Sequence, residues 1–259
     1  MHIVGPRKPG IGRMRSIVYH HSSAVYPRDS FLEVASGVYV SAPELVFVQM
    51  AESLSFGALL ALGYELCGCY SASSVHASVR HPLCSAERLR AYASRLSDAK
   101  GVRLARKVSR QVKPRSASPA ETELAAVVST SRVFGGLGLD KVALNEPVAL
   151  PRSGQRIAHA DTLICDVVWP DERIVLEYDS SAHHTDAAQI ARDARRRGGL
   201  AAAGFSVRSV TASQFAEALG FQEMVRQAFR ESGRYVRKLD AKQMARHMRL
   251  RYELRKWRG

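Results

Sequence analysis

The segment 164–184, ICDVVWPDERIVLEYDSSAHH, places acidic residues inside apolar runs that otherwise resemble buried β-strands. Asp166 lies in the first run, Glu177 and Asp179 end the second, and His183 and His184 follow. Carboxylate oxygens are ligands that Mg²⁺ prefers, and a bound Mg²⁺ lowers the pKa of water towards neutrality. Histidine can carry a proton in the same pH range. These residue types are therefore those of a site that cleaves phosphodiesters.

A hairpin with its tip at residues 171–172 would bring the acids together. In that register Asp166 lies directly across from Glu177, and Glu177 and Asp179 share one face because side chains alternate along a strand. Directly opposed like charges destabilise a sheet. We therefore expect Asp166 and Glu177 to hold Mg²⁺ or Mn²⁺. The competing interpretation is that the acids are solvated at strand ends, or that the register is shifted by one residue.

The surrounding pattern predicts an α/β fold in the second half of the chain. We expect a capped helix over 118–136, then strands at 141–150, 155–160, 163–169 and 173–179. A helix over 186–204, a strand over 205–210 and a helix from about 212 follow. This order predicts a mixed sheet flanked by helices.

The first half is predicted to be mainly helical. Helical patterns cover residues 41–54, 56–68, 85–96 and 100–115, with Ser41 and Ser85 as N-caps. The stretch PRSASPAE marks a domain boundary near residue 115. We expect domains at 1–115 and 116–225 and a basic helical tail at 226–259.

The charge balance of the 259 residues favours a polyanionic partner. The chain has 38 Lys and Arg against 24 Asp and Glu, a net charge of +14, which is typical of nucleic-acid-binding proteins. The expected tail alone has twelve Lys and Arg against three acids. We find neither an apolar run of about 20 residues nor a signal peptide. The sequence therefore predicts a cytoplasmic protein without a membrane partner.

The ordered motifs of residues 115–215 resemble the PD-(D/E)XK nuclease superfamily, and most of all its very-short-patch-repair-like bacterial endonuclease domains. The matching residues are SPAE at 118–121, Asp166, Glu177, Asp179, His183, His184, Arg192, Asp193, Arg196, Leu200, Gly204, Val207 and Thr211. The resemblance implies a restriction-endonuclease-like core with Asp166 and Glu177 as metal ligands and Glu121 as an accessory acid. This sequence differs from most of the superfamily in having Asp179 at the usual lysine position. The very-short-patch-like branch shares that change. Ser180 stands where a glycine is usual.

Several roles have two interpretations. Glu121 could be catalytic or could complete a capping box with Ser118. Arg192 and Arg196 share a helical face and could contact phosphate or hold the helix to the sheet. Of the two histidines, we favour His184 over His183 as the proton carrier. Basic residues expected to grip a nucleic-acid backbone are Arg106, Lys107 and Arg110 in the first half, together with the tail.

Residues 37–70, with GVYVSAPELVFVQMAESL and LLALGYELCGCY, resemble the middle region of abortive-infection antitoxin regulators. That resemblance implies a defence or mobile-element context. The leading prediction is a Mg²⁺-dependent endonuclease that acts on double-stranded DNA. One alternative is a catalytically inactive, antitoxin-like regulator that binds nucleic acid, and another is a protein that docks a partner toxin or nuclease through its tail.

Overall fold

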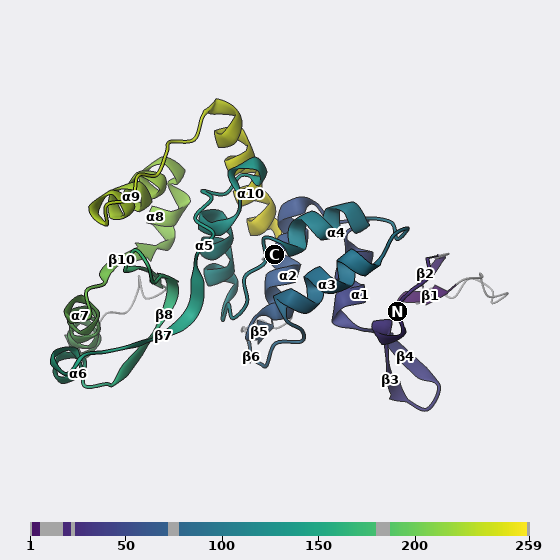
Figure 1. Cartoon of the computed structure of the whole chain (residues 1–259), viewed down its shortest axis with the longest axis horizontal. Helices are drawn as coiled ribbons and strands as arrows, with labels where there is room; N and C mark the ends of the chain where they lie inside the picture. The colour runs from purple at the N-terminus through teal and green to yellow at the C-terminus, as the bar shows by residue number, and fades with distance from the viewer. Residues whose placement is uncertain (1, 6–17, 22–23, 72–77, 180–186, 258–259) are drawn as a thin grey trace.

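The computed structural model describes residues 2–5, 18–21, 24–71, 78–179 and 187–257 (Figure 1). Its first half is mainly helical, as predicted. Two short strands pair in parallel, β1 (His2–Gly5) and β2 (Val18–His21), and a 3₁₀ turn, η1 (Arg28–Ser30), leads into a hairpin of β3 (Phe31–Ala35) and β4 (Val38–Ser41). The elements that follow are α1 (Pro43–Met50), α2 (Phe56–Cys67), β5 (Tyr70–Ser71), β6 (Ser78–Val79), α3 (Ala86–Arg95) and α4 (Val102–Ser109).

Local capping explains where these helices begin. The Ser85 hydroxyl accepts a hydrogen bond from the Arg88 amide at 3.2 Å, which confirms the predicted N-cap of α3. The predicted Ser41 cap is wrong. Ser41 is the last residue of β4 and pairs with Phe31, so Ala42 precedes α1 and no side chain caps that helix. Because Ser41 is paired in the β3–β4 hairpin, it is not at the N-cap position of α1.

The second half contains the predicted mixed sheet flanked by helices. Its elements are α5 (Pro119–Ser129), η2 (Arg132–Phe134), β7 (Ala143–Ala149), α6 (Arg152–Ala158), β8 (Thr162–Trp169), β9 (Ile174–Asp179), α7 (Ala187–Ala202), β10 (Ser206–Thr211), α8 (Ala212–Ala216), α9 (Ala218–Glu231) and α10 (Ala241–Trp257). The strand order is β10-β9-β8-β7, antiparallel except for the parallel β9–β10 pair. A parallel pair needs a crossover connection, and α7 lies in the segment that joins β9 to β10.

Helices cover both faces of this sheet. On one face Trp169 packs edge-on against Phe229 of α9, with ring centroids 5.1 Å apart, and α5 and α8 contribute to the same core. On the other face Val175 packs with Leu200 of α7, and Ala158 of α6 lies against the same cluster. The β8 and β9 strands are therefore central, and polar side chains on them need partners within the protein.

The strand predicted over residues 155–160 is wrong, because this segment belongs to α6. Pro151, with φ at −65°, leads into the helix, and His159 ends it in the left-handed conformation. Gly154 permits close packing on α7, since a Cβ there would lie 2.9 Å from the Gly199 carbonyl oxygen. Six residues of apolar alternation were too few to outweigh this helix–helix contact.

Residues 226–259, expected to form a basic helical tail, contain the end of α9 and all of α10. The final helix, α10, lies between α2 and α5 (Figure 1) and buries Leu250 and Leu254 in a core cluster that both halves of the chain share. Arg255 of α10 pairs with the buried Glu123 of α5 at 3.1 Å. The Gly57 amide of α2 donates to Glu253 Oε2 at 2.7 Å. This helix therefore joins the two halves instead of extending from them.

Candidate active site

Asp166 lies where the regular pairing of β8 changes. The predicted hairpin register is confirmed by the pairs Val167–Leu176 and Trp169–Ile174. Strands β7 and β8 pair on both sides of Asn145, but Asn145 itself is not paired with a residue of β8. Its φ of 47° places it in the left-handed region. Asp166 Oδ2 accepts a hydrogen bond from the Tyr178 amide at 2.9 Å. A carboxylate thus provides a cross-strand contact with β9.

Three acids from three elements influence one another at this point. The pKa of Asp166 is raised to about 6, first because the carboxyl group is largely buried and then because Glu121 and Glu177 add like charge. The hydrogen bond from Tyr178 and the charge of Arg196 act in the opposite direction. Glu121 and Glu177 therefore lie near enough to Asp166 for their charges to act on its carboxyl group. Perturbed carboxyl groups of this kind are frequent at functional sites.

The positive partner of Glu177 in the described structure is Arg196 of α7. The Arg196 Nε donates to both Glu177 oxygens at 3.2 Å, and Nη2 donates to Oε1 at 2.6 Å. Nη2 also donates to the Ile164 carbonyl oxygen of β8. Of the two interpretations of Arg196, phosphate contact or attachment of the helix to the sheet, the contacts show the second.

Glu121 makes half of the expected capping box: Ser118 caps α5, but the Glu121 carboxylate accepts from the Ser118 hydroxyl and the Ala117 amide and not from the Ser118 amide. The Ser118 hydroxyl accepts a hydrogen bond from the Glu121 amide at 3.1 Å and donates to Glu121 Oε1 at 2.9 Å. Oε2 accepts from the Ala117 amide at 2.9 Å and from Asn145 Nδ2 at 2.7 Å. The carboxylate is therefore held in place by its own helix cap and by β7, while its charge still acts on Asp166.

The remaining predicted catalytic residues follow β9 or end it. Asp179 is the last residue of β9, is half-buried and pairs with Thr211 of β10. His183, His184 and Ser180 lie outside the described residues.

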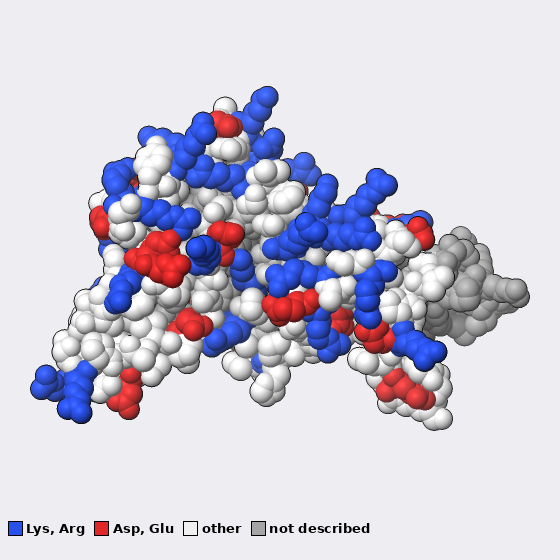
Figure 2. Space-filling view, viewed as in Figure 1, with Lys and Arg blue, Asp and Glu red and all other residues white. Residues whose placement is uncertain are grey.

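Only part of the predicted nucleic-acid-binding set is exposed. Lys107 and Arg110 lie on the surface at α4, in a region where Figure 2 shows Lys and Arg side chains gathered, whereas Arg106 donates to the Ala93 carbonyl oxygen at 3.0 Å and to that of Leu96. Arg106 thus stabilises the C-terminal end of α3. Arg192 of α7 is exposed and donates to Gln189 Oε1 at 2.7 Å, one turn before it.

The donors at the acidic site are chemically suited to a hard divalent cation. Asp166 and Glu177 offer carboxylate oxygens, the ligand type of Mg²⁺ and Mn²⁺. Within the described ranges, no group of three or more His, Cys, Asp or Glu side chains is arranged to hold a metal ion. Both oxygens of Glu177 accept hydrogen bonds from Arg196. The ligand types of Asp166 and Glu177 therefore suit a divalent cation, and the Glu177 carboxylate is paired with the Arg196 guanidinium.

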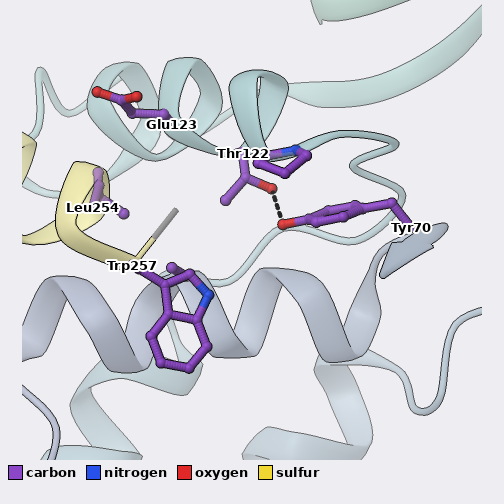
Figure 3. A pocket seen from close by; sticks show the side chains of 7 residues that line it. Tyr70, Thr122, Glu123, Leu254 and Trp257 are labelled. Atoms are coloured by element: carbon purple, nitrogen blue, oxygen red, sulfur yellow. Dashed lines mark hydrogen bonds between the residues drawn. The ribbon is translucent and has the colours of Figure 1, made fainter. Parts of the chain in front are cut away.

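The cavities lie away from these acids. One, of about 10 Å³, is enclosed by α2, β5, α5 and α10, and Figure 3 shows the Tyr70 hydroxyl directed to Thr122 Oγ1 at its edge, 2.8 Å away. This volume holds about one water molecule. A larger hollow of about 520 Å³ is lined mostly by apolar residues, among them Leu150, Pro170 and Phe205, and by none of the clustered acids. Asp166, Glu177 and Glu121 line neither of these two cavities.

Sequence reasoning missed the residues that hold the acids in position. Asn145 joins Glu121 to the backbone of Arg115, whose carbonyl oxygen accepts from Asn145 Nδ2 at 2.8 Å. Asparagine tolerates the left-handed conformation, so an Asn just before a Glu-Pro pair in a strand was an available signal. The buried thiol of Cys165, which lies close to Glu177, carried no such signal; burial raises its pKa to about 12.

Comparison with known proteins adds no family assignment. A scan against protein-family models and searches of curated proteins and solved structures each returned no match. Among the residues described here, none of the helices combines the length and apolar character that a membrane crossing requires. Functional inference therefore depends on the site itself.

Proposed function

We propose that this chain is a Mg²⁺-dependent endonuclease that hydrolyses phosphodiesters of double-stranded DNA in the cytoplasm. The observation that carries the proposal is the convergence of Asp166, Glu177 and Glu121, from β8, β9 and α5, at the break in β7–β8 pairing. Half-buried like charges disfavour ionisation of one another unless a positive group lies among them. Support also comes from the element order α5-β7-α6-β8-β9-α7-β10 around this site, together with the motifs that resemble the PD-(D/E)XK superfamily.

The residues have distinct roles in this proposal. Asp166 and Glu177 would hold the cation. Glu121, whose carboxylate accepts a hydrogen bond from Asn145, would add negative charge that attracts the same cation. A bound Mg²⁺ supplies polarisation of the phosphodiester and a water of lowered pKa. His183 or His184 would carry the proton to or from the reacting oxygens. Asp179, at the usual lysine position, would stand at the edge of the site.

The substrate would be held by the basic surface. Lys107 and Arg110 of α4 and the exposed basic residues of α10, such as Arg246, would contact the phosphate backbone (Figure 2). Such contacts are independent of sequence and weaken with salt as counterions are released. Arg106 is excluded from this set because its guanidinium is bonded to backbone carbonyl oxygens.

The test is a plasmid-nicking assay with the full-length protein in Mg²⁺ or Mn²⁺. Asp166→Asn and Glu177→Gln should each abolish nicking, since a neutral amide replaces a ligating carboxylate of similar shape. Asp171→Asn, at the exposed β8–β9 turn, is the matched control and should nick at the wild-type rate. Equal nicking by all four proteins would reject the assignment.

A second candidate is a nucleic-acid-binding regulator that does not cut. The observation in its favour is that the contacts of Glu177 with Arg196 and of Glu121 with its helix cap already satisfy both carboxylates. This candidate predicts salt-dependent DNA binding that is unchanged by EDTA and by Asp166→Asn, with no nicking in any divalent cation.

A partner-docking role for residues 226–259 needs a surface test and not a deletion. Because Leu250 and Leu254 of α10 pack in one core cluster with apolar residues of α2 and α5, removing α10 would expose those residues and should destabilise the fold around the site. Surface substitutions such as Lys242→Glu on the exposed side of α10 leave that core intact.

A further inference from the structure

The contact between Arg196 and Glu177 is more extensive than attachment of a helix requires. Three hydrogen bonds join the guanidinium to both carboxylate oxygens, and a fourth joins it to the Ile164 carbonyl oxygen of β8. The side chains of Arg196 and Glu177 are only 30% and 20% exposed. Bidentate pairs of this kind are strong and have a defined geometry. The guanidinium therefore covers the oxygens that a metal ligand would have to offer.

Arg196 is also the positive side chain that contacts this cluster directly, with Nη2 2.6 Å from Glu177 Oε1. Removing this charge would leave three acids from α5, β8 and β9 to be neutralised by something else. A divalent cation at Asp166 and an arginine on Glu177 would repel each other at short range. The two positive charges are thus alternatives and not partners.

The helix offers the displaced side chain another acceptor. Asp193 lies three residues before Arg196 on α7, a spacing at which side chains of one helix face meet. Its Oδ1 accepts a hydrogen bond from Gln189 Nε2 at 2.8 Å, so the carboxylate is oriented along the same face of α7. Rotation of the Arg196 side chain could therefore exchange one carboxylate for another without unfolding the helix.

We propose that Arg196 is a built-in counter-ion that gates the cation site. In the resting protein Arg196 neutralises Glu177, and it moves to Asp193 when a divalent cation binds at Asp166 and Glu177. The gate would keep the acids neutralised in the absence of cation and would make cation affinity low. This inference rests on the proposed function, because it assumes that Asp166 and Glu177 are the cation ligands.

The first test measures Mn²⁺ binding to full-length protein by electron paramagnetic resonance of the free ion. Arg196→Gln should bind Mn²⁺ at least about tenfold more tightly than wild type, since a competing charge is removed at short range. Arg192→Gln, one turn earlier on the exposed side of α7, is the matched control and should bind as wild type does. Adding Glu177→Gln to Arg196→Gln should eliminate the gain.

The outcomes separate the gate from the proposed function. Equal Mn²⁺ affinity in wild type and Arg196→Gln, both lost in Glu177→Gln, would overturn the gate and leave the cation site standing. Failure of Arg196→Gln to bind Mn²⁺ while it remains folded by circular dichroism would overturn both.

A second measurement follows the Arg196 side chain in the wild-type protein. In wild-type protein labelled with ¹⁵N-arginine, the Nε–H signal of Arg196, assigned by its absence in Arg196→Gln, should shift on titration with diamagnetic Mg²⁺. The Arg192 signal should stay in place. An Arg196 signal unchanged at Mg²⁺ saturation would show that the guanidinium remains on Glu177, which contradicts the gate.

Discussion

Replacing Asp166 with asparagine is expected to stabilise the metal-free protein. Burial and the charges of Glu121 and Glu177 raise the pKa of Asp166 from its ordinary 3.8 to about 6, so the ionised carboxylate is disfavoured in the folded state. A raised pKa contributes stability below pH 3.8 that is lost as the pH rises through about 6. At about 1.4 kcal/mol per pKa unit, the loss at pH 7 is about 3 kcal/mol as an upper limit. Asparagine has no charge to lose, and its Oδ1 can still accept from the Tyr178 amide.

The assay is urea unfolding in EDTA at pH 7 and at pH 4, with Asp171→Asn as an exposed control. The free energy of unfolding of Asp166→Asn should exceed that of wild type by about 1–3 kcal/mol at pH 7 and by much less at pH 4. A variant that is less stable than wild type at pH 7, or a gain of equal size at both pH values, would refute the reasoning. Stabilisation together with lost nicking would be the usual trade-off between stability and function at an active site.

The remaining predictions concern the core and the basic surface. His247 is buried and its pKa is lowered to about 4, because burial disfavours the charged ring. The neutral ring therefore contributes stability that is fully present above pH 6.5 and is lost as the pH falls through about 4. In urea unfolding, His247→Gln should remove about 3 kcal/mol of the difference in unfolding free energy between pH 7 and pH 4. Gly136→Ala would place a Cβ 1.9 Å from a backbone carbonyl oxygen and should lower the free energy of unfolding by about 3 kcal/mol or more. Gly37→Ala, at φ 71° in open space, should cost only about 1 kcal/mol, which thermal unfolding of the two variants will compare. The double variant Lys107→Gln, Arg110→Gln should weaken binding to all DNA sequences alike and reduce the salt slope of fluorescence anisotropy titrations by about 2, whereas an unchanged slope would place α4 away from the DNA.

Local patterns in the sequence were sufficient where one element decides its own structure. The hairpin register around residues 171–172, the Ser85 and Ser118 caps and the order β8, β9, α7, β10 were predicted, whereas the helix α6 before β8 was not. Alternation, caps and turn residues act between near neighbours, so they can be read without the rest of the fold. The same locality explains why the register of Val167 to Trp169 on Ile174 to Leu176 could be predicted before any tertiary contact was known.

Tertiary packing decided the rest. The contact between Arg196 of α7 and Glu177 of β9 forms only in the folded protein. From the sequence alone, Arg196 could either contact phosphate or hold the helix to the sheet. The basic composition of residues 226–259 predicted a basic helical tail that contacts nucleic acid, whereas in the structure Leu250 and Leu254 of α10 are buried against α2 and α5. A count of charged residues describes the exposed side of a helix. The position of the helix in the fold depends on its contacts with distant residues, such as the contact of Glu253 with Gly57, 196 positions away. Such long-range contacts leave no local pattern, which is why only the folded structure revealed them.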